Sequence, residues 1–398
     1  MVANADSRQS NARRLSTLLG LLLVALNLRP AITSVSTVLN QIGHDLDLSS
    51  AGQGILTTLP VLFLGFAAPL APRVARRIGT ERAIFAALTL LAFAIATRPY
   101  FGWAGLFVGT AIVGGCIGIM NVLLPGLVKR DFPGNVGLVT GLYTMSLNLG
   151  ASFGAGVTEP MRTIFGDDWR PALAFWLTPA VIAGLVWITQ IRDVHQSTSQ
   201  APQMRGIHRD PLTWQVTVFM GLQSSLAYIV FGWLPTILSD RGMAPVLAGL
   251  ALSISVLIQV TTAVLVPTIA TRMKDQRAAL TLVVIATMIG LGGCLYAPIS
   301  SIWVWITVLG LGQGGCFAMA LTLLAIRASD SATASQLSGL AQGVGYVVAA
   351  MGPLAVGLLH QAFGGWAIVG LLLGLIGLAE FIAGLYAGRD RVVESSSI

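Results

Sequence analysis

The sequence has little charge and few of the side chains that soluble enzymes use for chemistry. Only 10% of its 398 residues are charged, and it contains 4 histidines and 3 cysteines. A soluble chain of this length would fold into two or three domains, and its surface would need more polar residues than this composition provides. The composition therefore excludes an ordinary soluble protein.

The few cysteines and histidines form no recognisable chemical site. Cys116, Cys294 and Cys316 lie within apolar runs, where a thiol usually serves as a small packing residue. The histidines are expected in loops or at helix ends, so they do not form the cluster at a common depth that a membrane-embedded enzyme would need. We therefore expect no catalytic residues, no metal and no cofactor.

Apolar runs of about 20 residues, long enough to cross a bilayer as helices, recur along the whole chain. Hydrophobic residues make up 55% of the sequence, and the mean hydropathy is +0.80. These runs predict an all-α membrane protein with twelve transmembrane helices. We place them at 15–39, 51–73, 82–97, 101–128, 136–160, 171–191, 212–238, 246–271, 278–297, 301–326, 334–360 and 366–388.

The basic residues indicate how the helices are oriented. The net charge of +7 is scattered between the helices and forms no basic domain, so we expect no nucleic acid partner. With the N-terminus placed in the cytoplasm, eighteen of the 23 basic residues fall on that side and four on the other, and Arg29 lies within a helix. The positive-inside rule therefore predicts that both termini are cytoplasmic. The first apolar run is too long for a signal peptide and is expected to remain as the first helix.

The sequence divides into two halves with the same arrangement of predicted helices. Six predicted helices precede the longest polar stretch and six follow it, and short matches recur at offsets of 197 to 200 residues, such as "GGC" at 114–116 and 314–316. A common offset indicates an internal repeat. We predict two pseudo-symmetric six-helix bundles, 1–191 and 212–398, joined by a cytoplasmic linker at 192–211, with a substrate cavity between them.

Several stretches resemble the major facilitator superfamily and, within it, the cyanate and nitroimidazole transporter family. The resemblance rests on "LNLRPAITSV", "NVLLPGLVKRDFP", "GLYTMSLNLGASFGAG", "GLQSSLAYIVFGWLPTIL" and "LSGLAQGVGYVVAAMGP". It implies a transporter of cyanate-like anions or nitro-substituted heterocycles in the bacterial inner membrane. One loop departs from the superfamily pattern, because Arg76 stands where that pattern has an aspartate, which puts the usual contact of that carboxylate in doubt.

Arg29, in "NLRP", is the strongest candidate for a substrate-binding residue. A guanidinium stays charged at physiological pH and presents a planar fork of donors that suits a small or flat anion. A structural role, with bonds to helix-end carbonyls, is the alternative. Only Glu159 and Glu380 among the 16 acids lie within the predicted helices, so a carboxylate partner is hard to find. Thr33, at i+4, is expected on the same side, whereas Asn27 is expected to bond a neighbouring helix.

Other polar and aromatic residues are predicted at mid-membrane depth. Each could line the cavity or could join helices as interhelical hydrogen-bonding residues. Gln342 and Tyr346 are the best pair, because they follow Ser338 along one helix face. Trp233 could instead be an interfacial anchor. With Arg29 and Thr33, the predicted substrate-binding set contains Asn121, Tyr143, Gln223, Tyr228, Trp233, Gln342 and Tyr346.

We therefore predict a transporter that works by alternating access on a small anionic or electron-poor solute, with the bilayer as its surroundings and a monomer as its functional unit. Import and export are not distinguished. Multidrug/proton antiport is an alternative that requires an acid deep in the cavity, and a non-transporting sensor would call for a sizeable soluble domain. We expect that neither Glu159 nor Glu380 carries protons. The paired glycines Gly114/Gly118 and Gly150/Gly154 are expected to pack helices closely.

Overall fold

The computed structural model describes residues 2–132, 135–191, 207–329 and 331–393, and these are almost entirely helical. The N-terminal half contains α1 (Val2–Leu26), α2 (Pro30–Thr37), α3 (Leu39–Asp45), α4 (Ser50–Ala67), α5 (Ala71–Ile78), α6 (Thr80–Thr97), α7 (Gly102–Asp131), α8 (Val136–Ile164), α9 (Trp169–Ala174) and α10 (Leu177–Trp187). The C-terminal half contains α11 (Pro211–Asp240), α12 (Pro245–Ala270), α13 (Arg277–Tyr296), α14 (Ile302–Ile326), α15 (Ser331–Phe363) and α16 (Trp366–Ala387). Most of the predicted linker 192–211 lies outside the described residues.

Eleven helical segments among the described residues are long and apolar enough to cross a membrane. The remaining predicted span corresponds to α8, which has 29 residues. Its length suffices, but threonine, serine, asparagine and glycine interrupt its apolar character. Several of them, including Asn148, Gly150 and Ser152, are buried where α8 packs on α1, α2 and α12. The all-helical membrane fold predicted from the sequence is confirmed.

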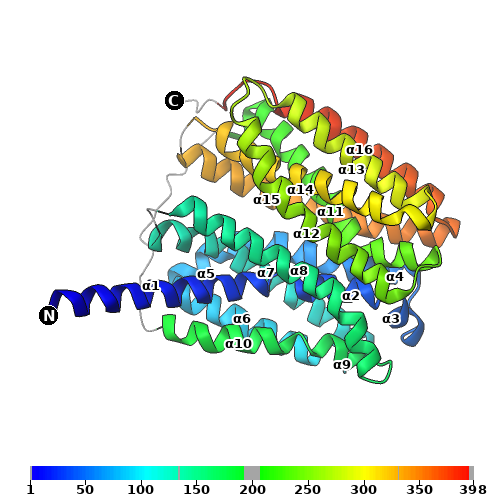
Figure 1. The fold of residues 1–398 in the computed structure, drawn as a ribbon, viewed down its shortest axis with the longest axis horizontal. Coiled ribbons are helices and arrows are strands. Elements are labelled where there is room, and N and C mark those ends of the chain that lie inside the picture. The colour runs from blue at the N-terminus through cyan, green and yellow to red at the C-terminus, as the bar shows by residue number, and fades with distance from the viewer. Residues whose placement is uncertain (1, 133–134, 192–206, 330, 394–398) are drawn as a thin grey trace.

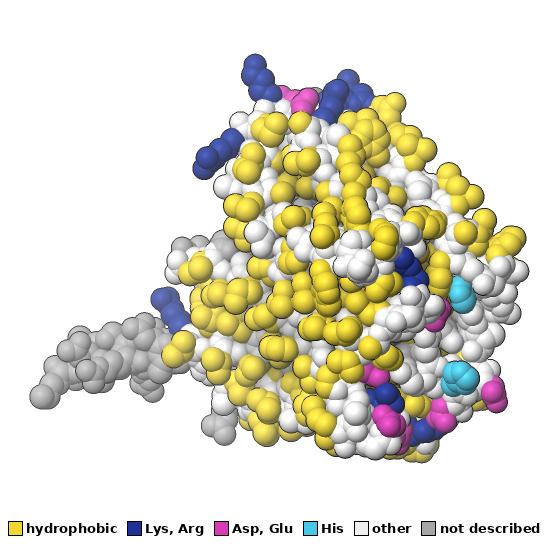
Figure 2. Space-filling model, turned by 45° about the vertical axis from the view of Figure 1, so that its right-hand side comes forward, with side chains coloured by type: hydrophobic (Ala, Val, Ile, Leu, Met, Phe, Trp, Pro, Cys, Tyr) yellow, Lys and Arg dark blue, Asp and Glu magenta, His cyan; other side chains and the backbone are white. Residues whose placement is uncertain are grey.

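The two halves lie side by side in Figure 1, with the N-terminal half below the C-terminal half. The halves meet where α4 packs on α15, α8 on α12 and α2 on α11. Both ends of the chain lie at the same end of the bundle (Figure 1). We call this the terminal end, and the opposite one, which carries α3 and α9, the far end. Figure 2 shows a broad hydrophobic surface with charged side chains gathered near its edges, as expected for a protein surrounded by lipid.

Glycine pairs bring helices of the N-terminal half into backbone contact, as predicted. Gly114 and Gly118 of α7 lie directly against the backbone of α4 at Pro60 and Leu64. Added Cβ atoms at these glycines would overlap that backbone, so no larger residue fits without a shift. Close approach of this kind is the usual role of small residues between membrane helices.

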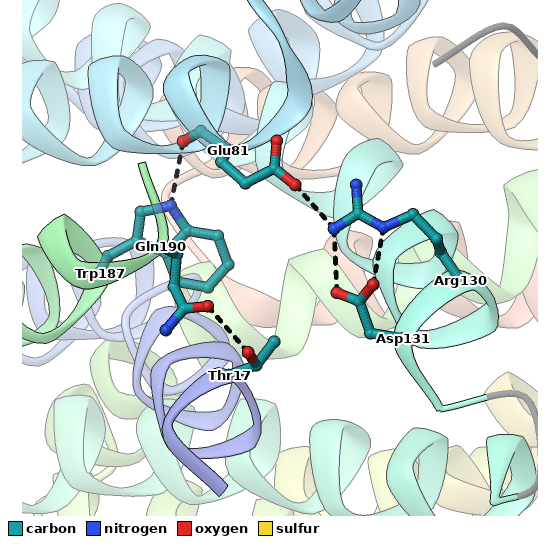
Figure 3. Close-up of polar contacts among 6 residues, drawn as sticks. All are labelled: Thr17, Glu81, Arg130, Asp131, Trp187 and Gln190. Carbon is teal, nitrogen blue, oxygen red and sulfur yellow. Dashed lines mark hydrogen bonds and ion pairs between the residues drawn. The ribbon is translucent and has the colours of Figure 1, made fainter. Parts of the chain in front are cut away.

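The loop that lacks the superfamily aspartate is followed by a different acid. Glu81, buried at the start of α6, forms an ion pair with Arg130 at 2.6 Å, and Arg130 also pairs with Asp131 at 2.6 Å (Figure 3). Hydrogen bonding to Asp131 and then to Glu81 raises the pKa of Arg130. The indole of Trp187 donates to the Glu81 carbonyl at 3.0 Å. Glu81 therefore supplies a carboxylate that joins the start of α6 to the end of α7, although the aspartate of the superfamily pattern is absent.

Candidate substrate site

The predicted first helix is not continuous, and the interruption lies at "NLRP". Pro30 has no N–H and disfavours the helical conformation of the residue before it. Arg29 accordingly has φ −121° and ψ −28°, and α1 ends at Leu26. The prediction of a single helix over 15–39 is therefore wrong, because this proline ends one helix and starts the next.

Asn27 stabilises the interruption. Its side-chain amide donates to the carbonyl of Leu23 at 2.8 Å and to the carbonyl of Pro179 on α10 at 3.1 Å. The first bond satisfies a backbone acceptor near the end of α1, and the second joins two helices. The prediction that Asn27 bonds a neighbouring helix is confirmed.

Two glycines of α8 lie against the residues on either side of the interruption. Gly150 lies against the carbonyl of Leu26, and Gly154 lies against Pro30 and the hydroxyl of Thr33. Because neither glycine has a side chain, α8 can approach the non-helical turn directly. This close contact fixes the position of Arg29 relative to α8.

The Arg29 side chain lies against the C-terminal half. Its guanidinium carbon is 5.3 Å from the ring centroid of Phe231 on α11 and 5.6 Å from that of Phe317 on α14. Both distances suit cation–π attraction. Among the described residues no carboxylate lies within ion-pair distance of this guanidinium, and the residue is partly exposed.

Three tyrosines from three helices lie within electrostatic range of the same charge. Arg29 interacts electrostatically with Tyr143 of α8, Tyr228 of α11 and Tyr346 of α15. The Tyr143 hydroxyl donates to Asn121 Oδ1 at 3.2 Å, and the rings of Tyr228 and Tyr346 meet edge to face at 6.2 Å. We name the following residues the central cluster: Arg29, Tyr143, Tyr228, Phe231, Phe317 and Tyr346.

The other predicted site residues on α15 and α11 differ in their surroundings. Gln342 is partly exposed one turn before Tyr346 and donates to Ser338 at 2.8 Å, so the expected polar stripe is present. Gln223 is buried, and its amide donates to Ser224 and to the Met220 carbonyl on its own helix. Gln342 is therefore one helical turn from Tyr346, a member of the central cluster, whereas the Gln223 amide forms its hydrogen bonds within α11.

Two further predicted residues are buried in contacts between helices. Thr33 is fully buried, and its hydroxyl donates to the Ala151 carbonyl of α8 at 2.9 Å. The Thr33 N–H donates to the Arg29 carbonyl at 3.1 Å, so the i+4 register is kept, but the hydroxyl is used in the contact with α8. Trp233 is buried and donates to the Pro353 carbonyl at 3.1 Å, with its ring near Trp366. Trp233 is thus a contact between α11 and α15 and not an exposed anchor.

Sequence reasoning missed three residues around the site. Phe231 and Phe317 have the spacing of ordinary apolar residues, so nothing in the sequence distinguishes them from core or lipid-facing side chains. Arg98, which the sequence assigns to a loop on the outer side, is 1% exposed and donates to the Ala31 carbonyl of α2 at 3.0 Å. Arg29 is therefore not the only basic side chain withdrawn from water; unlike Arg98, it faces the other half.

The cluster supplies a planar cation, aromatic faces and phenolic hydroxyls. A guanidinium binds oxygen acceptors through parallel N–H groups, and aromatic rings accept flat π-systems against their faces or edges. The described residues contain no group of three or more histidine, cysteine, aspartate or glutamate side chains that could hold a metal ion. The arrangement therefore suits binding of a small acceptor-bearing solute.

Comparison with known proteins agrees with this architecture. The family model described as Major Facilitator Superfamily matches residues 18–350. The chain is 39% identical over 394 residues to the 2-nitroimidazole transporter of Escherichia coli K12, covering 96% of this chain and 98% of the relative. It is 30% identical over 351 residues to the cyanate transport protein CynX of the same organism, covering 88% and 91%.

A solved structure shows the same fold at low identity. The chain superimposes with a TM-score of 0.78 on a bacterial homologue of the human lysosomal transporter Spinster in an inward-facing, unoccupied conformation. The sequence identity is 14%, and the match covers 96% of this chain and 99% of the other.

Proposed function

Because this chain belongs to the Major Facilitator Superfamily, we propose that it moves a small anionic or electron-poor solute across the bacterial inner membrane. The substrate class is a nitro-substituted heterocycle or a cyanate-like anion, as in the names of the two relatives. The transport mode is alternating access, the termini are cytoplasmic and the functional unit is a monomer. The single observation that carries the proposal is the Arg29 guanidinium, which packs on two phenylalanines of the other half and has no ion-paired carboxylate among the described residues.

The charge of Arg29 explains the preference for an acceptor. A cation withdrawn from bulk water is stabilised when a partner of opposite charge replaces its lost hydration. Phe231 and Phe317 supply part of this stabilisation, and a bound anion or nitro group would supply more. Because the cation lies at the junction of the halves, a ligand bound there touches both of them.

The tyrosines explain a preference for flat or small ligands. Each of the three interacts electrostatically with Arg29, and the rings of Tyr228 and Tyr346 contact each other edge to face. A thin ligand fits between such rings, and the phenolic hydroxyls can donate to its oxygen atoms. The proposed binding residues are accordingly Arg29, Tyr143, Tyr228 and Tyr346, with Asn121 and Gln342 next to them.

The contacts between the halves support alternating access. Among the described residues, four hydrogen bonds join the halves in the middle and at the far end of the bundle: Asn40 to Asp240, Ser50 to His360, Ala51 to Gln361 and Ser152 to Ser253. A bundle held together toward one end can open toward the other by rocking of the halves.

Binding to the purified protein tests the proposal. Melting temperature is measured with 2-nitroimidazole and with cyanate, and unsubstituted imidazole serves as the matched control that lacks the nitro group. A ligand that binds the folded state raises the apparent stability by RT ln(1 + [L]/Kd), about 2.7 kcal/mol at a hundredfold excess over Kd. We expect at least one of the two ligands to raise the melting temperature and imidazole to leave it unchanged. The ligand that stabilises the protein should also be taken up into proteoliposomes that contain it. If neither ligand binds nor is taken up, the proposed substrate class is wrong.

The multidrug/proton alternative requires an acid in the cavity. Among the described residues the central cluster has no carboxylate at ion-pair distance from Arg29. The cluster therefore favours an anionic or electron-poor solute over a cationic drug.

A further inference from the structure

The two glutamates within the helices have different surroundings. Glu159 on α8 forms an ion pair with Arg162 at 2.9 Å, so its charge is compensated. Glu380 on α16 is 0% exposed, its carboxyl oxygens accept from no N–H or O–H donor among the described residues, and its polar neighbour is the Cys316 thiol of α14. The earlier expectation that neither glutamate carries protons therefore has structural support for Glu159 alone.

The neighbours of Glu380 offer no positive charge. The titratable group that faces it is the thiol of Cys316 on α14, which lies 3.6 Å from the Thr287 hydroxyl of α13. Near Glu380 on the same helix, Gly377 lies against Met288 of α13 and Gly384 lies near Phe219 of α11. The immediate surroundings are thus a thiol, a hydroxyl and apolar groups.

The remaining titratable groups on the packed helices are engaged elsewhere. These are Tyr228 of α11 and Tyr346 of α15 in the central cluster, Asp240 of α11 bonded to Asn40, Tyr296 of α13 bonded to Ala367, Cys294 of α13 in an apolar core, Arg277 of α13 paired with Asp275, His360 of α15 stacked on Trp366, and Tyr386 of α16 against Arg389. Arg327, near the end of α16, donates to the carbonyls of Ala387 and Gly388 and to the side chain of Gln276.

An ionised carboxylate in this position would be strongly destabilised. Burying a lone carboxylate without a partner costs several kcal/mol or more, whereas the neutral acid loses only its hydrogen bonds to water. The carboxyl of Glu380 is therefore protonated in this conformation. Few positions in a transporter core are occupied by an unpaired acid without a role in moving charge.

We propose that Glu380 is the proton-binding site of the transport cycle. It holds a proton in the conformation described here. In another conformation its O–H bond breaks and the proton passes to water, and the carboxylate is later protonated again from the water on the other side. This inference rests on the proposed transport function and extends it to proton-coupled transport.

α14 connects this acid to the central cluster. Cys316 faces Glu380, and the next residue, Phe317, packs on Arg29. An anion at Arg29 and a carboxylate at Glu380 would place like charges on two sides of one helix, in a region of low dielectric constant. Anion binding and protonation of Glu380 should therefore favour each other, and by linkage the effect is reciprocal. This coupling corresponds to movement of the proton and the anion in the same direction.

Infrared spectroscopy tests the proton site without any substrate. The carbonyl stretch of a protonated carboxyl group is measured for the purified wild-type protein and for Glu380→Gln, with Glu159→Gln as the matched control. We expect the band to be lost in Glu380→Gln, kept in Glu159→Gln and shifted in frequency in Cys316→Ala, which keeps the acid and changes its neighbour. A band unchanged by Glu380→Gln would overturn the proposal. If that variant does not fold, the Cys316→Ala spectrum decides, and an unshifted band would count against the site.

Proteoliposomes test the coupling, with cyanate as the probe because it stays ionised across the neutral range. Uptake is compared with and without a pH gradient that is acidic on the side of the added cyanate. We expect the gradient to stimulate the wild type and Glu159→Gln, and Glu380→Gln to retain cyanate exchange but lose the stimulation. Gradient stimulation of Glu380→Gln equal to that of the wild type would refute the coupling. If the wild type neither binds nor takes up cyanate or 2-nitroimidazole, the proposed function fails, and the infrared measurement alone decides the proton site.

Discussion

Replacing Arg29 separates a binding role from a structural one. Arg29→Lys keeps the positive charge but removes the planar guanidinium, and Arg29→Ala removes both. If the residue binds substrate, affinity should fall in the order wild type, Arg29→Lys, Arg29→Ala. If it holds helices together, yield and melting temperature should fall first.

The contacts of Arg29 set the size of these effects. A hydrogen bond to a charged group contributes about 1.5–3 kcal/mol, so loss of the paired donors in Arg29→Lys should weaken binding by roughly 10- to 150-fold. Loss of the two cation–π contacts with Phe231 and Phe317 destabilises the fold by about 0.5–1 kcal/mol each. Removing a charge without an acid partner regains about 3 kcal/mol on membrane-insertion scales. The stability of Arg29→Ala should therefore stay close to that of the wild type.

The assay measures ligand affinity and melting temperature on the same purified samples, with whichever of 2-nitroimidazole and cyanate binds the wild type. Tyr296→Phe serves as a control, because Tyr296 lies at the far end with its hydroxyl on the Ala367 carbonyl. A well-folded Arg29→Ala variant with wild-type affinity would show that this arginine does not contact substrate. A large drop in its melting temperature would instead favour the structural role.

Three further predictions concern packing, charge and topology. Gly154→Ala should lower the melting temperature sharply, because its Cβ would overlap Pro30 and Thr33, whereas Gly141→Ala, with nothing within 4 Å, should be neutral or stabilising by up to about 1 kcal/mol. Glu81→Gln should destabilise the protein by about 1–2 kcal/mol, because the ion pair with Arg130 is lost. Solvent weakens this ion pair only in part, since Glu81 is buried and Arg130 is partly exposed. An unchanged thermal unfolding curve would contradict this prediction. A cysteine in place of Ser199 should stay unlabelled by an impermeant reagent in intact cells, and labelling would reverse the assigned orientation.

The sequence alone determined the features that depend on local chemistry. Long apolar runs can only become helices in a bilayer, because every backbone N–H and C=O must be paired within the segment, so the helical fold and most helix positions followed directly. Gly114/Gly118 and Gly150/Gly154 were predictable as close contacts, because their spacing places both glycines of a pair on one face. Arg29 could be singled out because a charge in such a run is costly.

Only the tertiary structure decided which side chains meet. In a membrane helix the faces toward lipid and toward protein are both apolar, so Phe231 and Phe317 could not be recognised as neighbours of Arg29. Thr33 keeps the i+4 register with Arg29, but the packing of α8 against α2 uses its hydroxyl, which donates to the Ala151 carbonyl. Glu159 and Glu380 both lie within predicted helices, but packing gives the first an arginine and leaves the second facing a thiol, with no basic partner among the described residues. The cost of a buried charge depends on its neighbours in space, and these come from helices far apart in the chain.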